Sequence, residues 1–329
     1  MDRLIFELSG PNYDMAEAEV KAVFEGSNFN YSSPISLKGI FSLKTSITPI
    51  QIGRRLGLTH RILSDGMITI NDEIKNKHIE INIPEGSAAV RTRRIAGTKA
   101  DTMKLKKSIG DIISENNEID LDNPEHVILT LISDKYAIGR VVYEKDSKDF
   151  QSREVKNRPY FSPVSLKPKY ARAMINMARV EDRARIHDPF CGTGGILIEG
   201  ALMGFDMSGG DIDKEMVEGC KMNLRKFGCE AKVSEGDVSQ TIPKDIDAVI
   251  TDPPYGRAST ISGENKEEIY KRLFKTCERK LIDGGYLSTI FPDKKYYDMG
   301  KEFLEPIERY KMMVHGSLDR HFCVFRKSN

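Results

Sequence analysis

The chain has 329 residues, a length that suits two or three domains and is ample for burying a core. Its formal net charge of +1 gives no general attraction to nucleic acid, so any basic footprint must be local. The five cysteines form no Cys-x-x-Cys pair, no apolar run approaches the length of a membrane span, and the N-terminus does not resemble a signal peptide. We therefore expect a soluble, cytoplasmic protein without a structural metal.

Residues 1–58 predict a small α+β unit. A strand is expected at 4–8 and a helix at 15–24, because apolar residues recur at the spacings of those elements. Short apolar runs at 35–43 and a helical pattern at 50–58 follow.

Residues 59–147 predict a second α+β block with a basic face. Its strands are expected at 88–95, 127–132 and 136–143, and its helix at 105–114. Lys and Arg dominate the first strand and the helix, with Arg91, Arg93, Arg94, Lys106 and Lys107 as candidate RNA contacts. Such clusters are more often solvated faces, so this interpretation depends on other signs of nucleic acid binding.

Residues 148–165 are predicted to form a charged linker. A second basic group spans the linker and the following helix, which is expected to start at Lys169: Arg153, Lys156, Arg158, Lys167, Lys169 and Arg172. Within the linker, Tyr160 and Phe161 either line a ligand pocket or anchor the linker to the next domain.

A glycine cluster then leads from a predicted strand into an apolar helix. It comprises Asp188, Pro189, Phe190, Cys191, Gly192, Thr193, Gly194 and Gly195. Glycines at such a turn let a ligand approach the backbone closely. The Gly-Lys-Ser/Thr of a P-loop is missing, and an acid at the entrance would repel a pyrophosphate but suits an amino-acid ammonium. The pattern therefore favours S-adenosylmethionine as the cofactor.

Further acids follow at the ends of the next predicted strands. Asp211, with Ile212 beside it, comes about twenty residues after the glycine cluster, where a carboxylate accepts hydrogen bonds from ribose hydroxyls. Asp237, with Val238, is placed to accept from the adenine amino group. Each acid alone is more often a solvated surface residue. Their order after Asp188 makes a cofactor pocket the better interpretation.

The run Asp252-Pro253-Pro254-Tyr255 ends the following strand. A nucleobase amine is a weak nucleophile, so an enzyme that methylates it must accept its hydrogens and orient its lone pair. Asp252 and the carbonyl of Pro253 offer acceptors on a stiff backbone, Pro254 adds to that stiffness, and Tyr255 offers a flat face for an unstacked base. The alternative is an ordinary turn after a strand.

The rest of the C-terminal half predicts packing elements. Helical repeats at 216–227 and 269–281 are assigned to the core, as is His187. A strand at 286–291 and a hairpin formed by 311–314 and 321–325 complete the sheet.

Residues 166–329 resemble the class I S-adenosylmethionine-dependent methyltransferases in the order and spacing of the glycine cluster, Gly-Asp-Ile-Asp and Asp-Pro-Pro-Tyr. Residues 59–147 resemble a THUMP RNA-binding domain. This implies an α/β fold in which a C-terminal Rossmann-like methyltransferase domain is preceded by α+β ferredoxin-like (1–58) and THUMP domains.

The whole arrangement is similar to archaeal THUMP-containing tRNA guanine-N2 methyltransferases acting at position 10. The resemblance implies one and then a second methyl transfer to guanine N2 of tRNA, with Asp252 and Pro253 holding the amine and Tyr255 stacking the base. A monomer is expected, and the need for a small activating partner stays open.

Alternatives remain at this stage. They are an amino-methyltransferase acting on another guanine position, on ribosomal RNA or on adenine N6 in DNA or RNA, and a catalytically silent RNA-binding subunit. Glutamine methyltransferases of release factors favour Asn where this chain has Asp252.

Overall fold

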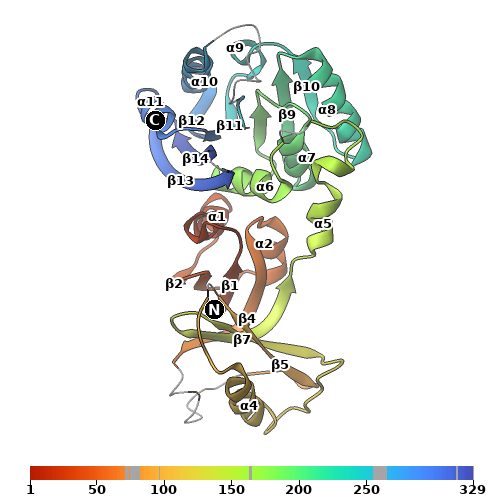
Figure 1. Cartoon of the computed structure of the whole chain (residues 1–329). Coiled ribbons are helices and arrows are strands. Elements are labelled where there is room, and N and C mark those ends of the chain that lie inside the picture. The colour runs from red at the N-terminus through yellow and green to blue at the C-terminus, as the bar shows by residue number, and fades with distance from the viewer. Residues whose placement is uncertain are drawn as a thin grey trace. The chain divides into compact units, whose positions relative to one another are not determined.

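The computed structural model describes residues 1–70, 74, 82–95, 97–162, 165–254, 265–315 and 318–328. The chain divides into two compact units, each built on its own seven-stranded sheet (Figure 1). The first unit comprises Met1–Glu17 and Phe29–Lys145, and the second comprises Ala18–Asn28 and Asp146–Asn329. None of the helices in these described ranges is long and apolar enough to cross a membrane.

The sheet of the first unit has the strand order β2-β3-β1-β4-β7-β6-β5. Neighbouring strands are antiparallel except β5 and β6, which are parallel. The strands are β1 (Asp2–Leu8), β2 (Ser32–Leu37), β3 (Ile40–Thr45), β4 (Thr59–Thr69), β5 (Ala88–Arg94), β6 (His126–Ile132) and β7 (Tyr136–Glu144). The helices that the structure describes in this part of the sequence are α1 (Tyr13–Gly26), α2 (Pro49–Arg55) and α4 (Thr102–Ile113). The strands and helices predicted from periodicity are confirmed, with shifted ends.

The two predicted N-terminal blocks share this one sheet. Strand β1 pairs with β4, with Ile5 opposite Leu63 and Phe6 opposite Ile62. The boundary predicted after residue 58 therefore falls at the first residue of β4, inside a continuous sheet. A ferredoxin-like domain that ends there stays a prediction.

The sheet of the second unit has the order β10-β9-β8-β11-β12-β14-β13. The first five strands in this order are parallel, and β14 is antiparallel to both of its neighbours. The strands are β8 (Arg185–Asp188), β9 (Asp206–Asp211), β10 (Lys232–Glu235), β11 (Ile246–Thr251), β12 (Leu281–Phe291), β13 (Glu305–His315) and β14 (Leu318–Arg326). This mostly parallel sheet confirms the predicted α/β fold class and the C-terminal hairpin.

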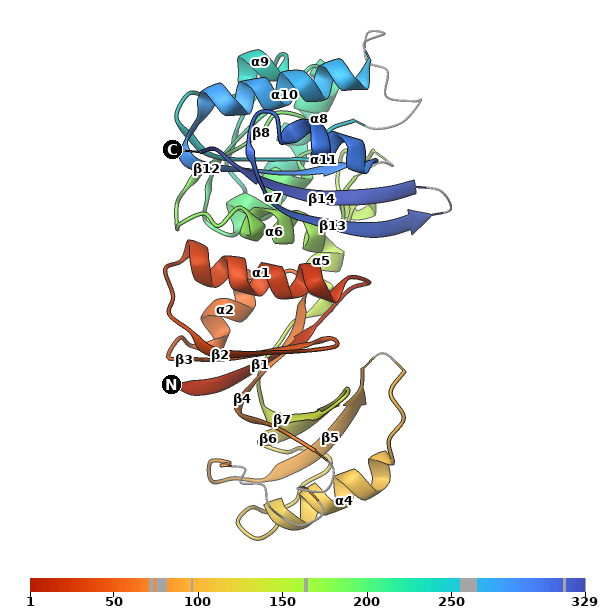
Figure 2. The ribbon, with the colours of Figure 1, turned by 90° about the vertical axis from the view of Figure 1, so that its left-hand side faces the viewer.

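Helices lie on both faces of the second sheet (Figure 2). On one face, Tyr270, Leu273 and Phe274 of α10 pack in one core with residues of β11, β12 and β14. On the other face, α6 contacts α7. The helices of this unit are α5 (Ser147–Ser152), α6 (Pro168–Met177), α7 (Gly195–Leu202), α8 (Lys214–Lys226), α9 (Val238–Thr241), α10 (Lys266–Lys280) and α11 (Lys294–Gly300).

Besides Asp146 at the start of α5, four capping side chains set where helices of this unit begin. They are Asp213, Asp237, Asn265 and Asp293, at the starts of α8, α9, α10 and α11. Each side-chain oxygen accepts a hydrogen bond from the backbone N–H two residues further on. Such a cap stabilises a helix by about 1 kcal/mol, so the local sequence fixes these helix starts.

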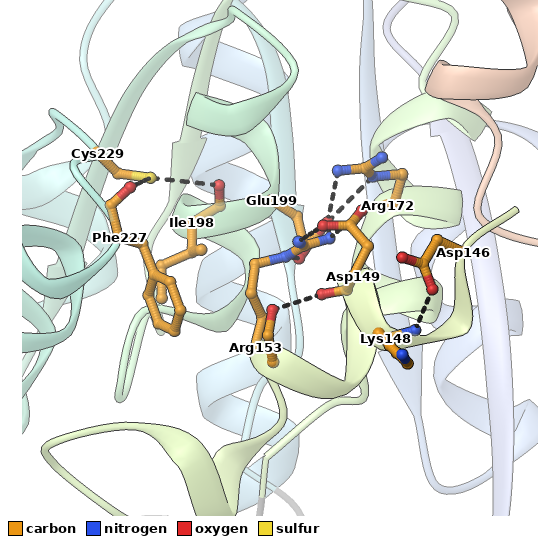
Figure 3. A network of polar contacts seen from close by, with 10 residues as sticks. Asp146, Lys148, Asp149, Arg153, Arg172, Ile198, Glu199, Phe227 and Cys229 are labelled. Carbon is orange, nitrogen blue, oxygen red and sulfur yellow. Dashed lines mark hydrogen bonds and ion pairs between the residues drawn. The ribbon is translucent and has the colours of Figure 1, made fainter.

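A buried ion cluster ties the predicted linker to the helices of the second unit (Figure 3). Glu199 on α7 accepts from Nε of Arg153 at 2.6 Å and from Nε of Arg172 on α6 at 3.0 Å. The ring of Phe150 lies 5.3 and 5.1 Å from the two guanidinium carbons. The first part of the linker is therefore packed as α5 and the turn that follows it.

The sequence pattern indicated an exposed basic footprint for the second basic group, and this is wrong for its three arginines. Arg153, Arg158 and Arg172 are buried. Nε of Arg158 donates to the carbonyl of Arg153 at 3.0 Å, and burial lowers the pKa of Arg158. An arginine can be buried where acids and carbonyls satisfy its donors, and Glu199, the acid that Arg153 and Arg172 share, is distant from both in sequence. Lys156, Lys167 and Lys169 of the same group are not buried.

Glu199→Gln should destabilise the protein by about 3–5 kcal/mol, because it leaves two buried guanidinium groups facing a neutral amide. Thermal unfolding of the full chain measures this loss. Glu218→Gln is the matched control, since Glu218 pairs with Lys221 on the surface of α8 and such exposed pairs contribute less than about 1 kcal/mol. Equal melting temperatures for the two variants would contradict the assignment.

Candidate active site at the carboxyl edge of the second sheet

Three predicted acids meet where parallel strands end. Asp188 is the last residue of β8 and Asp211 the last of β9, and Asp252 directly follows β11. Strand β8 pairs with both β9 and β11, so the three acids lie along one edge. The chain runs outward to β9 on one side of β8 and later to β11 on the other. This is the switch point at which open α/β sheets bind ligands.

Asp188 is a carboxyl group buried in the protein. Its Oδ1 accepts from Oγ1 of Thr251 at 2.6 Å and from the backbone N–H of Phe190 at 3.1 Å. Burial raises the pKa of Asp188 to about 7, against the opposing effect of these hydrogen bonds, and the charges of Asp211 and Asp252 raise it further. The site therefore favours a cation beside Asp188.

The glycine loop is a tight turn that closes onto the sheet. The N–H of Cys191 donates to the carbonyl of Gly210 at 2.9 Å, and that of Gly194 to the carbonyl of Cys191 at 2.8 Å. Gly194 has φ +83°, and a Cβ there would stand 2.7 Å from Sγ of Cys220. Gly192 has φ +47°, but a Cβ there would meet nothing within 4 Å. The turn thus needs glycine, and the backbone at Gly192 leaves room for a ligand.

Asp211 holds the glycine loop from the neighbouring strand. Its Oδ2 accepts from the N–H of Gly192 at 2.9 Å and its Oδ1 from the N–H of Asp213 at 3.0 Å. Burial raises the pKa of Asp211. Each carboxylate oxygen retains capacity for a further donor. Ile212 beside it is 45% exposed, which offers an apolar surface next to a polar acceptor.

Asp237 follows the outer strand β10, and the N–H of the preceding Gly236 donates to the carbonyl of Asp211 at 2.9 Å. Its Oδ1 caps α9 by accepting from the N–H and the hydroxyl of Ser239, and its Oδ2 pairs with Nε of Arg272 at 3.2 Å. The side chain of Val238 is buried in the core beside α10. Structural partners therefore occupy both oxygens of Asp237, although the sequence pattern assigned it only to a ligand.

The Asp-Pro-Pro segment is held by a buried tyrosine of α10. Asp252 and Pro254 are partly exposed and Pro253 is buried. The hydroxyl of the fully buried Tyr270 donates to the carbonyl of Pro254 at 2.8 Å. Tyr270 falls within a helical repeat that predicted only packing, but a buried tyrosine hydroxyl needs a partner, and that signal could have singled it out. Tyr255 lies outside the described residues.

The linker is attached to the glycine loop by Asn223 of α8. The amide of Asn223 exchanges hydrogen bonds with the backbone of Tyr160 at 2.9 and 3.0 Å and donates to the carbonyl of Thr193 at 2.9 Å. The Tyr160 hydroxyl donates to Glu215 at 2.8 Å. Tyr160 is therefore an anchor, and Phe161 stays 59% exposed. Nothing in the local sequence distinguishes Asn223 from a solvated helix residue.

His187 is buried in the sheet, as its sequence context predicted. Its Nδ1 lies 2.9 Å from Oγ of Ser208. Burial, with a contribution from Lys280, lowers the pKa of His187 to about 3. His187 is therefore neutral at physiological pH.

The arginines of β5 contact the protein itself. Arg91 donates to the carbonyl of Leu121 and Arg94 to that of Ala100, each at 2.6 Å. Nε of Arg93 pairs at 2.5 Å with Glu7, which is fully buried. Replacing Arg93 would therefore disturb the core as well as any RNA contact.

The two lysines predicted to contact RNA, Lys106 and Lys107, are exposed on α4. Lys107 also borders a cavity of about 560 Å³ together with Lys104 and Tyr136. These lysines are available to phosphate, and substituting them tests an RNA contact without unpairing a buried acid.

Family models match both parts of the chain. A model described as an RMKL-like methyltransferase domain matches residues 156–320, and a THUMP domain model matches residues 70–138. The chain is 33% identical to the tRNA (guanine(10)-N2)-dimethyltransferase of Methanothermobacter thermautotrophicus, over 97% of this chain and 98% of that protein. It is 34% identical to the protein of the same name from Pyrococcus abyssi, with the same coverage.

Solved structures share the fold over almost the whole length. The crystal structure of TrmN from Thermus thermophilus aligns with a TM-score of 0.60 at 15% identity, over 99% of each chain. A possible methylase from Clostridium difficile aligns with a TM-score of 0.55 at 16% identity, over 99% of this chain and 98% of that one. At these identities the likeness shows the fold alone.

Asp188→Asn should stabilise the protein increasingly as the pH rises. Because the folded-state pKa of Asp188 is about 7 and its ordinary value is 3.8, the folded protein keeps a proton that the unfolded chain loses in this interval. The contribution of the protonated Asp188 to the stability of the wild type is fully present below about pH 3.8 and is lost as the pH rises through 7. The advantage of the variant over the wild type should grow by about 1.4 kcal/mol per pH unit up to pH 7 and then level off.

Urea unfolding across this pH range measures the difference. Asp283→Asn serves as the control, since Asp283 is 70% exposed in a pair with Lys327. A difference between the Asp188 variant and the wild type that does not depend on pH would show that Asp188 ionises normally.

Proposed function

Because the chain belongs to the tRNA (guanine(10)-N2)-dimethyltransferase family, we propose that it transfers methyl groups from S-adenosylmethionine to the exocyclic N2 of a guanosine in tRNA, first one and then a second. The observation that carries this proposal is the junction of the glycine loop with Asp188, Asp211 and Asp252 at the switch point of a mostly parallel sheet. A THUMP-matching region precedes this site in the same chain.

The residues at this edge fit the cofactor. Asp188 is a buried carboxyl group that would gain from an ammonium ion beside it, and the space at Gly192 lets the cofactor approach the backbone. Asp211 would accept from the ribose hydroxyls, and Ile212 would contact the adenine ring. The sulfonium of S-adenosylmethionine, when bound, supplies an electrophilic methyl group.

The chain's own part in the reaction is to hold the amine. Asp252 and the carbonyl of Pro253 accept hydrogen bonds from N2, which turns its lone pair toward the methyl group. Positive charge develops on the nitrogen during transfer, and the Asp252 carboxylate stabilises it and can take the proton that leaves. Proline at 253 and 254 restricts the backbone so that these acceptors need little reorganisation. Tyr255 would stack on the guanine.

The substrate is a polyanion, so binding needs cations outside the catalytic edge. Lys106 and Lys107 on α4, with the outer parts of Arg91, Arg93 and Arg94 on β5, are proposed to contact phosphates. These residues lie in or beside the region that matches the THUMP model.

Incubation with unmodified tRNA and methyl-labelled cofactor tests the proposal. After digestion, N2-methylguanosine and N2,N2-dimethylguanosine should carry the label, and fragment mapping should place them at one guanosine. Methyladenosine or methylcytidine would overturn the proposed substrate. Failure of calorimetry to detect binding of S-adenosylmethionine would favour a silent RNA-binding protein instead.

Asp252→Ala should lower the rate of methyl transfer by at least about 10³-fold while the affinity for S-adenosylmethionine stays within a few-fold of wild type. The loss follows from removing an acceptor and a charge at the reacting nitrogen. Single-turnover assays and calorimetry measure the two quantities. Asp283→Ala, at an exposed site distant from the acids, is the control and should keep full activity. Turnover by Asp252→Ala would rule out this role.

Tyr270→Phe should lower kcat by about 10-fold, because the carbonyl of Pro254 loses the donor that fixes the backbone behind Asp252. The affinity for S-adenosylmethionine should not change. Tyr296→Phe is the matched control, since the rings of Tyr296 and Tyr270 pack with centroids 4.6 Å apart in the same core. Steady-state kinetics measure kcat for both variants. Equal kcat values would show that the Tyr270 hydroxyl does not position the backbone behind Asp252.

A further inference from the structure

The β13–β14 hairpin extends past the edge at which the acids lie. Strand β12 ends at Phe291, which pairs with His321. Beyond this pair, Arg320 of β14 still pairs with Met312 of β13, and Asp319 with Met313. Figure 2 shows the two strands continuing beyond the body of the sheet. The hairpin therefore carries side chains to the side of the sheet where the substrate is proposed to enter.

Arg320 lies near the edge of the sheet at which the substrate is proposed to enter. Thr251 of β11 pairs with Thr289 of β12, which pairs with Cys323 of β14. Asp252 is thus level with Phe322, and Arg320 lies two residues further out. With strands about 4.8 Å apart and a rise of about 3.3 Å per residue, the Cα atoms of Asp252 and Arg320 are roughly 12 Å apart.

The start of α6 lies against the face of the hairpin that carries Phe322. The rings of Tyr170 and Phe322 lie with centroids 5.8 Å apart, and Nζ of Lys169 stands 5.0 Å over the Tyr170 ring. Arg320 shares the face of Phe322, because side chains alternate along a strand, and its charge acts on Tyr170. Lys167 precedes α6 and repels Lys169. We name the cationic residues at this place, Lys167, Lys169 and Arg320, the α6–hairpin patch.

The energetics of the patch favour an anion. Burial and the charge of Lys167 lower the pKa of Lys169, so both act against its charged form. The N-terminal end of the ten-residue helix α6 adds the positive end of a helix dipole, which also attracts negative charge. Cations held together in this way are stabilised when a phosphate binds between them.

We propose that the α6–hairpin patch binds the RNA backbone beside the nucleotide that enters the active site. This inference rests on the proposed function and gives the second unit an RNA contact of its own, independent of the basic face of α4 and β5. A base that leaves its stack must have its flanking phosphates held while it is turned inward. The patch meets that need because it stands beside the catalytic edge.

The test uses the full chain with Lys169→Gln and Arg320→Gln combined. Filter binding of unmodified tRNA between about 50 and 200 mM KCl should show a salt slope smaller by about 1–2 and an affinity at least about 10-fold weaker than wild type. Binding of S-adenosylmethionine should not change. The charge-keeping pair Lys169→Arg and Arg320→Lys should restore the slope.

A charge-matched control comes from the opposite edge of the sheet. Lys226 ends α8 and Lys232 begins β10, and both are exposed. The pair Lys226→Gln and Lys232→Gln should leave the salt slope close to wild type.

The outcomes separate the two proposals. If the patch variant and this control bind tRNA alike while the wild type methylates it, the inference fails and the proposed function stands. If the wild type binds tRNA through the patch but transfers no methyl group, the proposed function fails and the RNA contact stands. A wild type that does not bind tRNA overturns both.

Discussion

The burial of Asp188 is the constraint on which the site depends. A carboxyl group with a pKa of about 7 destabilises the folded chain when it ionises, and Asp211 and Asp252 increase that cost. The sheet tolerates it because β11, which leads into Asp252, shares an extensive apolar core with α10. The same property that lowers stability creates affinity for a cation at the switch point. A functional site is where such an unfavourable arrangement is expected.

The shape of the glycine loop is determined by partners on three sides. Asp211 accepts from the N–H of Gly192, and Asn223 holds the carbonyl of Thr193 together with the backbone of Tyr160. Behind the loop, Glu199 fixes the segment that carries Arg153. The linker is therefore part of the framework of the cofactor site. A substitution in the linker that breaks these buried polar contacts should therefore alter the conformation of the glycine loop.

Much of this architecture could be predicted because its signals are local. The strand before Asp252 is a short apolar run followed by two prolines, a glycine cluster follows Asp188, and α8, α9, α10 and α11 begin at Asp or Asn caps. Parallel pairing then brings the acids to one edge. The errors concern side chains whose role depends on distant partners. The charged linker pattern could not show that Arg153 meets Glu199, and the core repeat of α10 could not show that Tyr270 meets Pro254.

The sequence by itself determined the order of motifs, the α/β class and the family, because strand and helix periodicity and glycine turns are set by nearby residues. Tertiary structure alone decided which charges are solvated. An arginine has the same local pattern whether it faces water or a buried acid, and only the surrounding fold supplies its partner and its dielectric environment. For that reason Arg158 lies buried beside Thr193 of the glycine loop, whereas Lys169 at the start of α6 stays partly exposed.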